Sequence, residues 1–328
     1  MKKYLITLIL LISLSACTLP GLSGSSKNND IVIASGGITE RQIVSEIVAQ
    51  MIRHYMPDTR VDILSNLGSS VLINQAMISG DANISSVMYT GTSLTGELGL
   101  EATTNVEEAF WTVVNGFSEQ YDRVWFPSVG FTNTYAFMVS RSFAEEHNLN
   151  TISDMKDIAE DLRTGIDSAW LQREGDGYTD FKIKYDYEFG TVTPMEISLV
   201  YSAVLAGTMD VVLGYSTDGR IDAYDLVVLE DDLNFFPPYD ASPVTSMKIL
   251  KAYPELEDVL LRLENKISSE IMQKLNRKSD EDKIEPNIVA REFLEENNFF
   301  EDASIIKLKD RKGYEKVLEN MEALDKND

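Results

Sequence analysis

The strongest constraint on the fold is a regular alternation of strand-like and helix-like segments that starts near residue 31. Short β-branched or alternating runs are separated by stretches in which apolar residues recur every four positions. In chain order these segments predict strand, helix, strand, helix and strand over residues 31–34, 43–55, 60–64, 68–80 and 84–89. This order predicts parallel strands joined by helical crossovers, and therefore a doubly wound α/β lobe.

A second group of elements begins near residue 131. The pattern predicts strands over residues 131–140, 209–215 and 225–229, and helices over residues 152–162 and 194–206. Thr193, followed by Pro194, is typical of a capping box at the start of the last of these helices. From Val244 onward the pattern is mostly helical and charged.

The two groups predict two lobes, because a chain of 328 residues is long enough for each lobe to bury its own core. We expect one lobe to comprise residues 30–129 and 236–328, and the other to comprise residues 130–235. The chain then crosses between the lobes twice, which is a hinge geometry. Two hinged lobes over a cleft are suited to enclosing a small ligand.

The amino terminus has the pattern of an export signal. Lys2 and Lys3 precede an apolar run over residues 4–14, and Ser15-Ala16-Cys17 follows. The run is too short to span a bilayer, which takes about twenty apolar residues. Residues 1–16 are therefore expected to be a signal peptide. Cys17 has an alternative interpretation, in which it is only a small residue at the end of such a signal.

Cys17 is the only cysteine of the chain, so an internal disulfide is excluded. Its position, directly after Leu-Ser-Ala, resembles that of the lipidated cysteine of bacterial lipoproteins, which implies cleavage before Cys17 and a diacylated terminal cysteine as the anchor. Two or more acyl chains hold a protein on a membrane. Residues 17–29, rich in Gly and Ser, are then the lipid anchor and a flexible tether. This predicts a protein on the extracytoplasmic face of the cell membrane.

Charge and motif content exclude several classes of function. The formal net charge of −24 repels nucleic acid and anionic lipid, and solubility explains it better than steering of cations. The two histidines, His54 and His147, form no catalytic constellation with the single cysteine. The sequence holds no zinc-protease, serine-hydrolase or phosphate-loop motif. We expect no enzyme, no cofactor and no metal.

Four tyrosines lie at the ends of apolar segments, beside turn-forming residues: Tyr89, Tyr135, Tyr215 and Tyr239. In α/β proteins such positions supply ligand contacts at the carboxyl ends of strands. Several aromatic faces around one cleft can hold a quaternary ammonium, because each ring presents a negative face to the cation. The alternative is four half-buried tyrosines whose hydroxyls are satisfied by the protein.

Five segments around these tyrosines resemble the osmoprotectant-binding lipoproteins of bacterial ABC importers, in the same order and over the whole mature chain. They are YTGTSLTG (89–96), NTYAF (133–137), YSTDGRI (215–221), YDLVVLEDD (224–232) and FFPPYDASPV (235–244). The resemblance implies a two-lobed type II periplasmic-binding-protein-like fold with the ligand in the inter-lobe cleft. It implies capture of glycine betaine, carnitine or choline in a tyrosine cage, for delivery to a membrane permease driven by a cytoplasmic ATPase.

Three more residues are candidates for ligand contact. Asn133 lies two residues before Tyr135, so both side chains share one face of an extended strand, although Asn133 could instead cap a turn. Gln42 resembles the family's amide donor near the first helix, with Arg41 as an alternative in the same register. In a second interpretation, Gln42 closes a capping box on Thr39.

Thr92 matches a position where family members carry a hydroxyl or an acidic side chain. A neutral threonine there leaves room for a ligand carboxylate, whereas an aspartate would repel it. Thr92 therefore favours betaine-like or broad specificity, although it is also an ordinary small turn residue. The order of glycine betaine, carnitine, choline, proline betaine and ectoine stays open.

Two other functions fit the same chain in part. One is a two-lobed binding lipoprotein for another small solute, such as an amino acid or a methylamine without a carboxylate. The other is a surface lipoprotein for adhesion or sensing, which needs no ligand cleft. For the osmoprotectant-binding function we expect a monomer.

Overall fold

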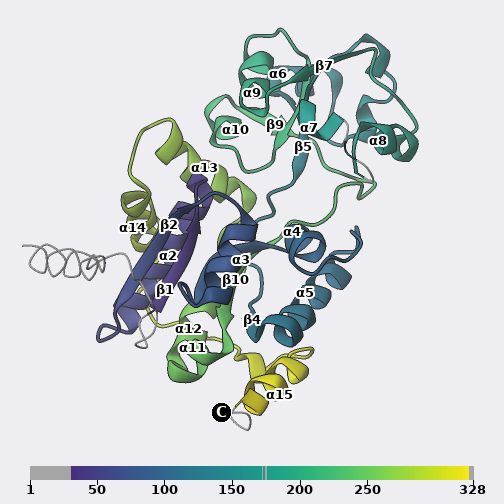
Figure 1. The fold of residues 1–328 in the computed structure, drawn as a ribbon. Helices are drawn as coiled ribbons and strands as arrows, with labels where there is room; N and C mark the ends of the chain where they lie inside the picture. Colours follow the sequence, from purple (N-terminus) through teal and green to yellow (C-terminus); the bar gives the residue numbers. More distant parts are fainter. Residues whose placement is uncertain (1–30, 172, 174–175, 325–328) are drawn as a thin grey trace, which may run out of the picture.

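The computed structural model describes residues 31–171, 173 and 176–324, and these fold into two α/β lobes (Figure 1). The first lobe is built on a five-stranded sheet of order β2-β1-β3-β10-β4. Strand β1 is parallel to β2 and β3, and β10 is antiparallel to β3 and β4. The strands are β1 (Ile31–Gly36), β2 (Val61–Leu67), β3 (Ile84–Tyr89), β4 (Arg123–Trp125) and β10 (Ala241–Ser246).

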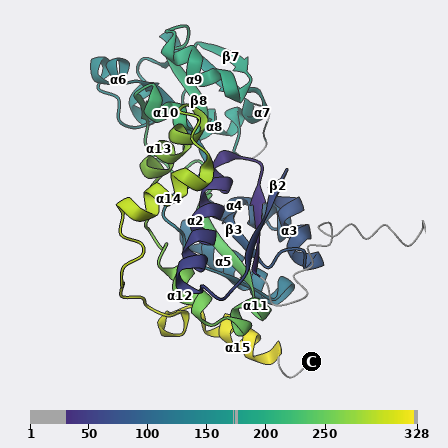
Figure 2. The same ribbon diagram turned by 90° about the vertical axis from the view of Figure 1, so that its left-hand side faces the viewer.

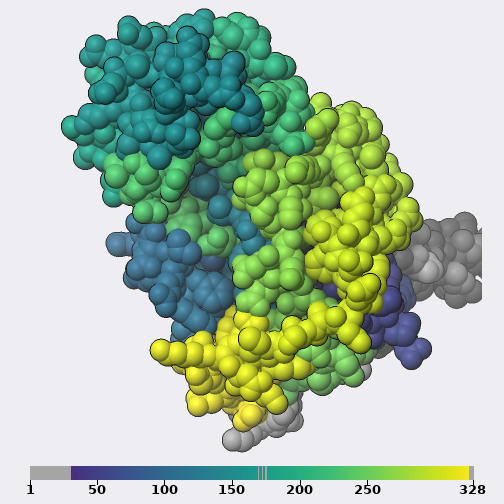
Figure 3. All heavy atoms as spheres, turned by 180° about the vertical axis from the view of Figure 1, so that it is seen from behind, coloured from purple at the N-terminus to yellow at the C-terminus, as the bar shows by residue number. Residues whose placement is uncertain are grey.

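Helices from both ends of the described chain cover this sheet. The helical elements before β4 are α2 (Thr39–Tyr55), α3 (Ser70–Ser79), α4 (Thr90–Thr92), the π-helical turn η2 (Ser93–Glu97) and α5 (Val106–Tyr121). Those after β10 are α11 (Met247–Ala252), α12 (Glu255–Leu261), α13 (Ser269–Asp280), α14 (Pro286–Glu296), η5 (Leu308–Asp310) and α15 (Glu315–Ala323). Figures 2 and 3 show that the C-terminal segment, in yellow, wraps the first lobe and leaves the second lobe free of it.

The second lobe is built on a five-stranded sheet of order β7-β6-β8-β5-β9. Its strands are β5 (Tyr135–Ser140), β6 (Arg163–Asp167), β7 (Thr191–Met195), β8 (Val211–Tyr215) and β9 (Leu226–Val228). Its helical elements are α6 (Arg141–His147), η3 (Ser153–Met155), η4 (Ala159–Asp161), α7 (Ser168–Leu171), α8 (Tyr178–Tyr185), α9 (Ile197–Leu205) and α10 (Gly219–Ala223). Strand β5 is antiparallel to β8 and β9, while β6 is parallel to β7 and β8.

The predicted elements of the first lobe are confirmed as far as β3. In α2 the residues spaced by four, Ile43, Ile47 and Met51, are fully buried, because one face of the helix packs on the sheet. Helix α3 begins at the Ser69 cap, whose side chain accepts the Leu72 backbone N–H at 3.2 Å. It ends at Gly80, which has the left-handed conformation common at helix ends.

Several predictions for the second group of elements were wrong. Thr193 and Pro194 do not cap a helix but lie within β7, an edge strand in which the missing N–H of proline is tolerated. The helix starts later, at Ile197. The segment 152–162 forms two short 3-10 turns, η3 and η4, instead of one helix. Strand β10 extends into the region that was predicted to be helical. The sequence did not indicate this strand, because its side chains are buried on both faces and show no alternation.

Helix α13 joins the lobes in addition to the two chain crossings. Its Gln273 and Asn276 side-chain amides donate to the backbone carbonyls of Ser216 and Thr217 in the second lobe, at 2.7 and 2.8 Å. Here α10 and α13 lie so close that a Cβ on Gly219 would be 2.5 Å from a backbone nitrogen of α13. The lobes therefore meet at a fixed contact on one side of the molecule (Figures 1 and 2).

The second lobe depends on an aromatic core that can be tested by truncation. Phe137 is fully buried and its ring lies 5.0 Å from the Phe181 ring and 5.9 Å from the Trp170 ring. We expect Phe137→Ala to lower the free energy of unfolding of this lobe by about 3–5 kcal/mol, through lost burial and a residual cavity. Denaturant unfolding followed by tryptophan fluorescence measures it.

The matched control is Ile183→Ala in the same lobe, because Ile183 is 76% exposed. It should change the free energy of unfolding by no more than about 0.5 kcal/mol. A similar loss in both variants would mean that the aromatic cluster is not the source of the lobe's stability.

Candidate functional site

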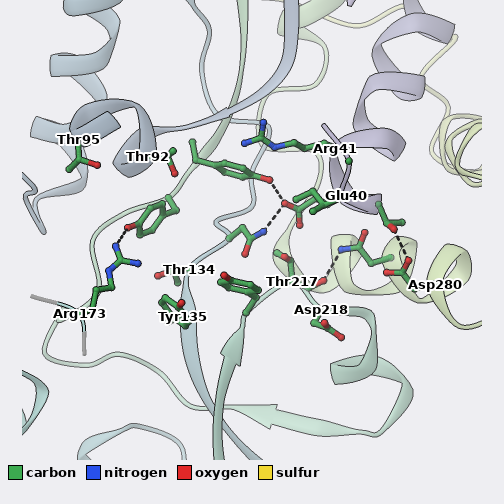
Figure 4. Close-up of a pocket in the computed structure, with 18 residues that line it drawn as sticks. Glu40, Arg41, Thr92, Thr95, Thr134, Tyr135, Arg173, Thr217, Asp218 and Asp280 are labelled. Carbon is green, nitrogen blue, oxygen red and sulfur yellow. Dashed lines mark hydrogen bonds between the residues drawn. The ribbon is translucent and has the colours of Figure 1, made fainter. Parts of the chain in front are cut away.

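A cavity of about 660 Å³ lies between the lobes and is lined from both (Figure 4). The first lobe contributes the loop before α2 and its first turn, the end of β3 with α4 and η2, and the final turns of α13. The second lobe contributes the start of β5 and the end of β8 with the turn that follows. Both chain crossings reach the cavity as well, at Asn133 and Tyr239. The cavity is therefore the inter-lobe cleft.

All four predicted tyrosines line this cavity. Antiparallel pairing of β5 with β8 sets Tyr135 directly opposite Tyr215, and their ring centroids are 5.1 Å apart. Tyr215 is 41% exposed although it is a large aromatic residue, because its ring is open to the cavity. Tyr89 lies at the end of β3 and Tyr239 on the returning crossing, so the rings come from both lobes and the hinge.

The hydroxyl of Tyr135 is held in place by a hydrogen bond within the second lobe. It donates a hydrogen bond to Asp167 Oδ2 at 2.8 Å. Burial, together with this bond to a carboxylate, raises the pKa of Tyr135 well above its usual value. The ring therefore stays neutral, and its orientation is set by β6, the strand that carries Asp167.

Glu40 is a cavity residue that the sequence analysis did not single out. Its side chain, 3% exposed, lies in the first turn of α2. One carboxyl oxygen, Oε1, accepts the Tyr89 hydroxyl and the Asn133 Nδ2–H, the second at 3.0 Å. Burial raises the pKa of the Glu40 carboxyl, against the hydrogen-bond donors that favour its charged form. The other oxygen, Oε2, accepts no hydrogen bond from the residues that the structure describes.

Arg173 is the second cavity residue that sequence reasoning missed. Its Nη2 donates to the Tyr239 hydroxyl at 2.9 Å, and its Nε pairs with Asp176 at 2.7 Å. The guanidinium also lies 5.8 Å from the centre of the Tyr135 ring. Arg173 therefore brings a positive charge from the second lobe into the group of tyrosines (Figure 4). It carries no motif and follows a turn of helix, so the sequence gives no local signal for it.

The sequence predicted Thr92, Asn133 and Gln42 as ligand-contacting residues. Thr92 and Asn133 line the cavity, but Gln42 does not. The Gln42 amide points away, to the Gly37 carbonyl and to Asn66 Oδ1, both at 3.4 Å. The capping box on Thr39, which was the alternative interpretation of Gln42, is also absent, because α2 begins after Ile38 without a side-chain cap.

Arg41, the alternative to Gln42, does line the cavity. Its guanidinium lies over the Tyr89 ring at 4.9 Å from the centroid. Its Nη2 donates to the Ser70 hydroxyl at 3.0 Å, at the start of α3. The helical register explains why Arg41 lines the cavity and Gln42 does not: Glu40 and Arg41 face the cleft, whereas Gln42 lies on the next face of α2.

The segment Asp218-Gly219-Arg220 is held by its own residues. Arg220 Nε and Nη2 donate to the two oxygens of Asp218, each at 2.8 Å. Among residues 31–171, 173 and 176–324, no group of three metal-ligating side chains comes together. Within the same ranges, no helix is long and apolar enough to cross a membrane.

Known proteins share this sequence and fold. A family model for the substrate-binding domain of ABC-type glycine betaine transport systems matches residues 29–296. The carnitine transport binding protein OpuCC of Listeria monocytogenes is 50% identical over 309 residues, which cover 92% of this chain and 99% of that protein.

Solved structures agree with these matches. A crystal structure described as a glycine betaine/carnitine/choline ABC transporter aligns with a TM-score of 0.81 and 45% identity, over 83% of this chain and all of that one. Apo YehZ from Escherichia coli aligns with a TM-score of 0.74 over 82% of this chain and 99% of its own, but at 20% identity it supports the fold alone. The predicted two-lobed binding-protein fold is confirmed. The chain belongs to the family of substrate-binding domains of ABC-type glycine betaine transport systems, which are binding proteins and not enzymes.

Proposed function

We propose that this protein captures zwitterionic quaternary ammonium solutes such as carnitine and glycine betaine, with the ammonium head held by Tyr89, Tyr135, Tyr215 and Tyr239. The observation that carries the proposal is that these four rings line one inter-lobe cavity. A trimethylammonium group donates no hydrogen bonds, so ring faces are its natural partners. The names of the relatives, a carnitine-binding protein and a glycine betaine/carnitine/choline transporter, support the same class of solute.

The charges around the cavity favour a ligand that carries both signs. Arg173 lies at the Tyr239 side, and Glu40 lies at the Tyr89 side. A ligand carboxylate is attracted to the Arg173 guanidinium, which can donate two parallel hydrogen bonds to it. The ammonium head is attracted to the ring faces, which present a negative face to a cation. Thr92 lines the cavity and is neutral, so it does not repel a ligand carboxylate as an acidic residue at this position would.

Binding and lobe closure are coupled in this proposal. The lining residues come from both lobes, so a bound solute makes its full set of contacts only when the lobes are together. The contact between α13 and α10 keeps the lobes aligned on one side while the cleft opens on the other. We propose that the closed form delivers the solute to a membrane permease driven by a cytoplasmic ATPase, in the role that the family has in ABC transport.

The lobe boundaries near residues 130 and 236 are part of the proposal. They are supported by the core clusters, because β1 to β4 and β10 share one cluster, while the core of the second lobe is formed by residues of 135–236. A single chain encloses the cavity, which supports action as a monomer. The proposed signal peptide and lipid anchor at Cys17 lie outside the described residues.

Removal of one ring tests the cage. For the soluble form that starts at residue 27, we expect saturable binding of carnitine or glycine betaine by calorimetric titration. Tyr215→Ala should weaken that binding by about 3- to 30-fold, since one ring contributes about 0.5–2 kcal/mol to holding a cation. Tyr224→Ala is the control, because Tyr224 is a half-buried tyrosine of the same lobe that does not line the cavity. Absence of heat and of thermal stabilisation with carnitine, glycine betaine and choline would contradict the proposed function.

Replacement of the cavity cation tests the carboxylate partner. We expect Arg173→Gln to weaken carnitine and glycine betaine about tenfold, because a charge-assisted hydrogen bond to the ligand carboxylate is lost. Choline has no carboxylate, so its dissociation constant should change less than about threefold. Titration of all three solutes measures the difference. A parallel loss for all three would show that Arg173 only holds Tyr239 in place.

The lipid anchor is tested on the full chain. We expect Cys17→Ala to release the protein from the membrane fraction of bacterial cells, because the tether then carries no acyl chain. Fractionation with and without detergent measures the distribution, and the unaltered chain is the control. Retention of the variant on membranes without detergent would contradict lipidation at Cys17.

A further inference from the structure

Two hydrogen-bond acceptors in the cavity wall have no donor within the described part of the chain. They are Glu40 Oε2 and Asn133 Oδ1. Both residues line the inter-lobe cavity and belong to different elements, the first turn of α2 and the crossing before β5. An acceptor that is buried without a donor costs free energy in the empty protein. A ligand that brings a donor to this position recovers that cost.

The imbalance arises because two donors share one oxygen. The Tyr89 hydroxyl and the Asn133 amide both donate to Glu40 Oε1. Oε2 is thereby left with both of its lone pairs free. The carboxyl points toward Thr217 of the second lobe (Figure 4). The Thr217 hydroxyl is close enough to the Glu40 carboxyl to act as a donor that favours its charged form, but the contact does not reach the geometry of a hydrogen bond to Oε2.

The ligand group that fits this position is a hydroxyl. Trimethylammonium and carboxylate groups have no N–H or O–H, so glycine betaine brings no donor at all. Carnitine and choline each add a single hydroxyl to the same ammonium head. A hydroxyl donates to a charged carboxylate and accepts from a protonated one, so it suits Glu40 in either state. A second carboxylate would be repelled by the charged form.

We propose that Glu40, positioned by Tyr89 and Asn133, is a specificity residue that binds the hydroxyl of hydroxylated quaternary ammonium solutes through its free oxygen. The inference rests on the proposed function, since it needs the ammonium head in the tyrosine cage. It deepens that function by separating solutes with the same head. Carnitine and choline gain a hydrogen bond at Glu40 that their deoxy analogues and glycine betaine do not.

The experiment compares solutes that differ by one hydroxyl. The pairs are carnitine with 4-(trimethylammonio)butanoate, and choline with ethyltrimethylammonium. In the unaltered protein we expect the hydroxylated solute of each pair to have a dissociation constant about tenfold lower than that of its deoxy analogue. This is the effect expected of one hydrogen bond to a charged group. In Glu40→Leu the ratio of the two dissociation constants should fall to about one. Because the ratio is taken within one variant, a general loss of cage geometry cancels.

The control variant is Glu97→Leu. Glu97 is also a carboxylate without hydrogen-bond partners for either oxygen among the described residues, but it lies outside the cavity. It should leave the ratio unchanged. The ratio in the unaltered protein needs no variant, so equal binding of the two members of each pair overturns the hydroxyl site even if Glu40→Leu does not fold.

The outcomes separate the two proposals. Equal binding of both members of each pair by the unaltered protein would overturn the hydroxyl site while leaving the tyrosine cage intact. A tenfold ratio that survives in Glu40→Leu would assign the hydroxyl to another residue and overturn the role of Glu40. Failure of every solute, glycine betaine included, to bind would contradict the proposed function itself. A ratio that falls to about one in Glu40→Leu alone supports the proposal.

Discussion

The site depends on one buried carboxyl. Glu40 accepts hydrogen bonds from Tyr89 and Asn133, and so joins the start of α2, the end of β3 and the first crossing between the lobes. Without it, a buried tyrosine hydroxyl and a side-chain amide would each lose an acceptor inside the protein, which costs about 1–3 kcal/mol for each group. The position of Tyr89 against the cleft follows from this link. The position of Asn133 fixes where the chain enters the second lobe, two residues before Tyr135.

Charged side chains of both lobes face the cleft, Glu40 and Arg41 from the first lobe and Arg173, paired with Asp176, from the second. Glu40 belongs to the first lobe and Arg173 to the second, so separation of the lobes also separates these charges. In the structure Arg173 contacts Tyr239 and lies beside Tyr135, which are ring faces that a ligand cation would use. A zwitterion can take over both contacts, with its ammonium on the rings and its carboxylate on the guanidinium. A simple cation meets Arg173 as a like charge. The cavity wall holds a buried acid, Glu40, although the residue at position 92 is a neutral threonine.

The sequence predicted the parts of the fold and site that follow local rules. The alternation of residues 31–89 gave β1, α2, β2, α3 and β3, since each pattern is set by one buried face. The tyrosines were predictable because they lie at the ends of apolar segments next to turns, although only Tyr89 and Tyr215 end strands. Tyr135 begins β5, and Tyr239 lies on the returning crossing. Glu40 and Arg173 were not predictable, because a charged residue near a helix end or turn is usually solvated. Only the packing of the two lobes buries Glu40 and brings the exposed Arg173 to Tyr239. Strand β10 was missed for a related reason. It pairs with β3 and β4, which lie far from it in the sequence, and no local sequence pattern indicates such a pairing.

The contact between α13 and α10 limits how the cleft can open. Asn276 of α13 donates to the Thr217 carbonyl, and Arg277 of the same helix pairs with Asp222 at 2.8 Å. Thr39, at the start of α2, donates to Asp280 at the end of α13. The cleft wall on this side is therefore one hydrogen-bonded unit made of α2, α13 and α10. Since these bonds hold fixed groups together, a motion that keeps them must rotate the second lobe about this wall. Such a rotation would move Arg173 and Tyr215 more than Thr217, so the side of the cavity that holds Arg173 would open while the side that holds Glu40 and Tyr89 stayed nearly constant.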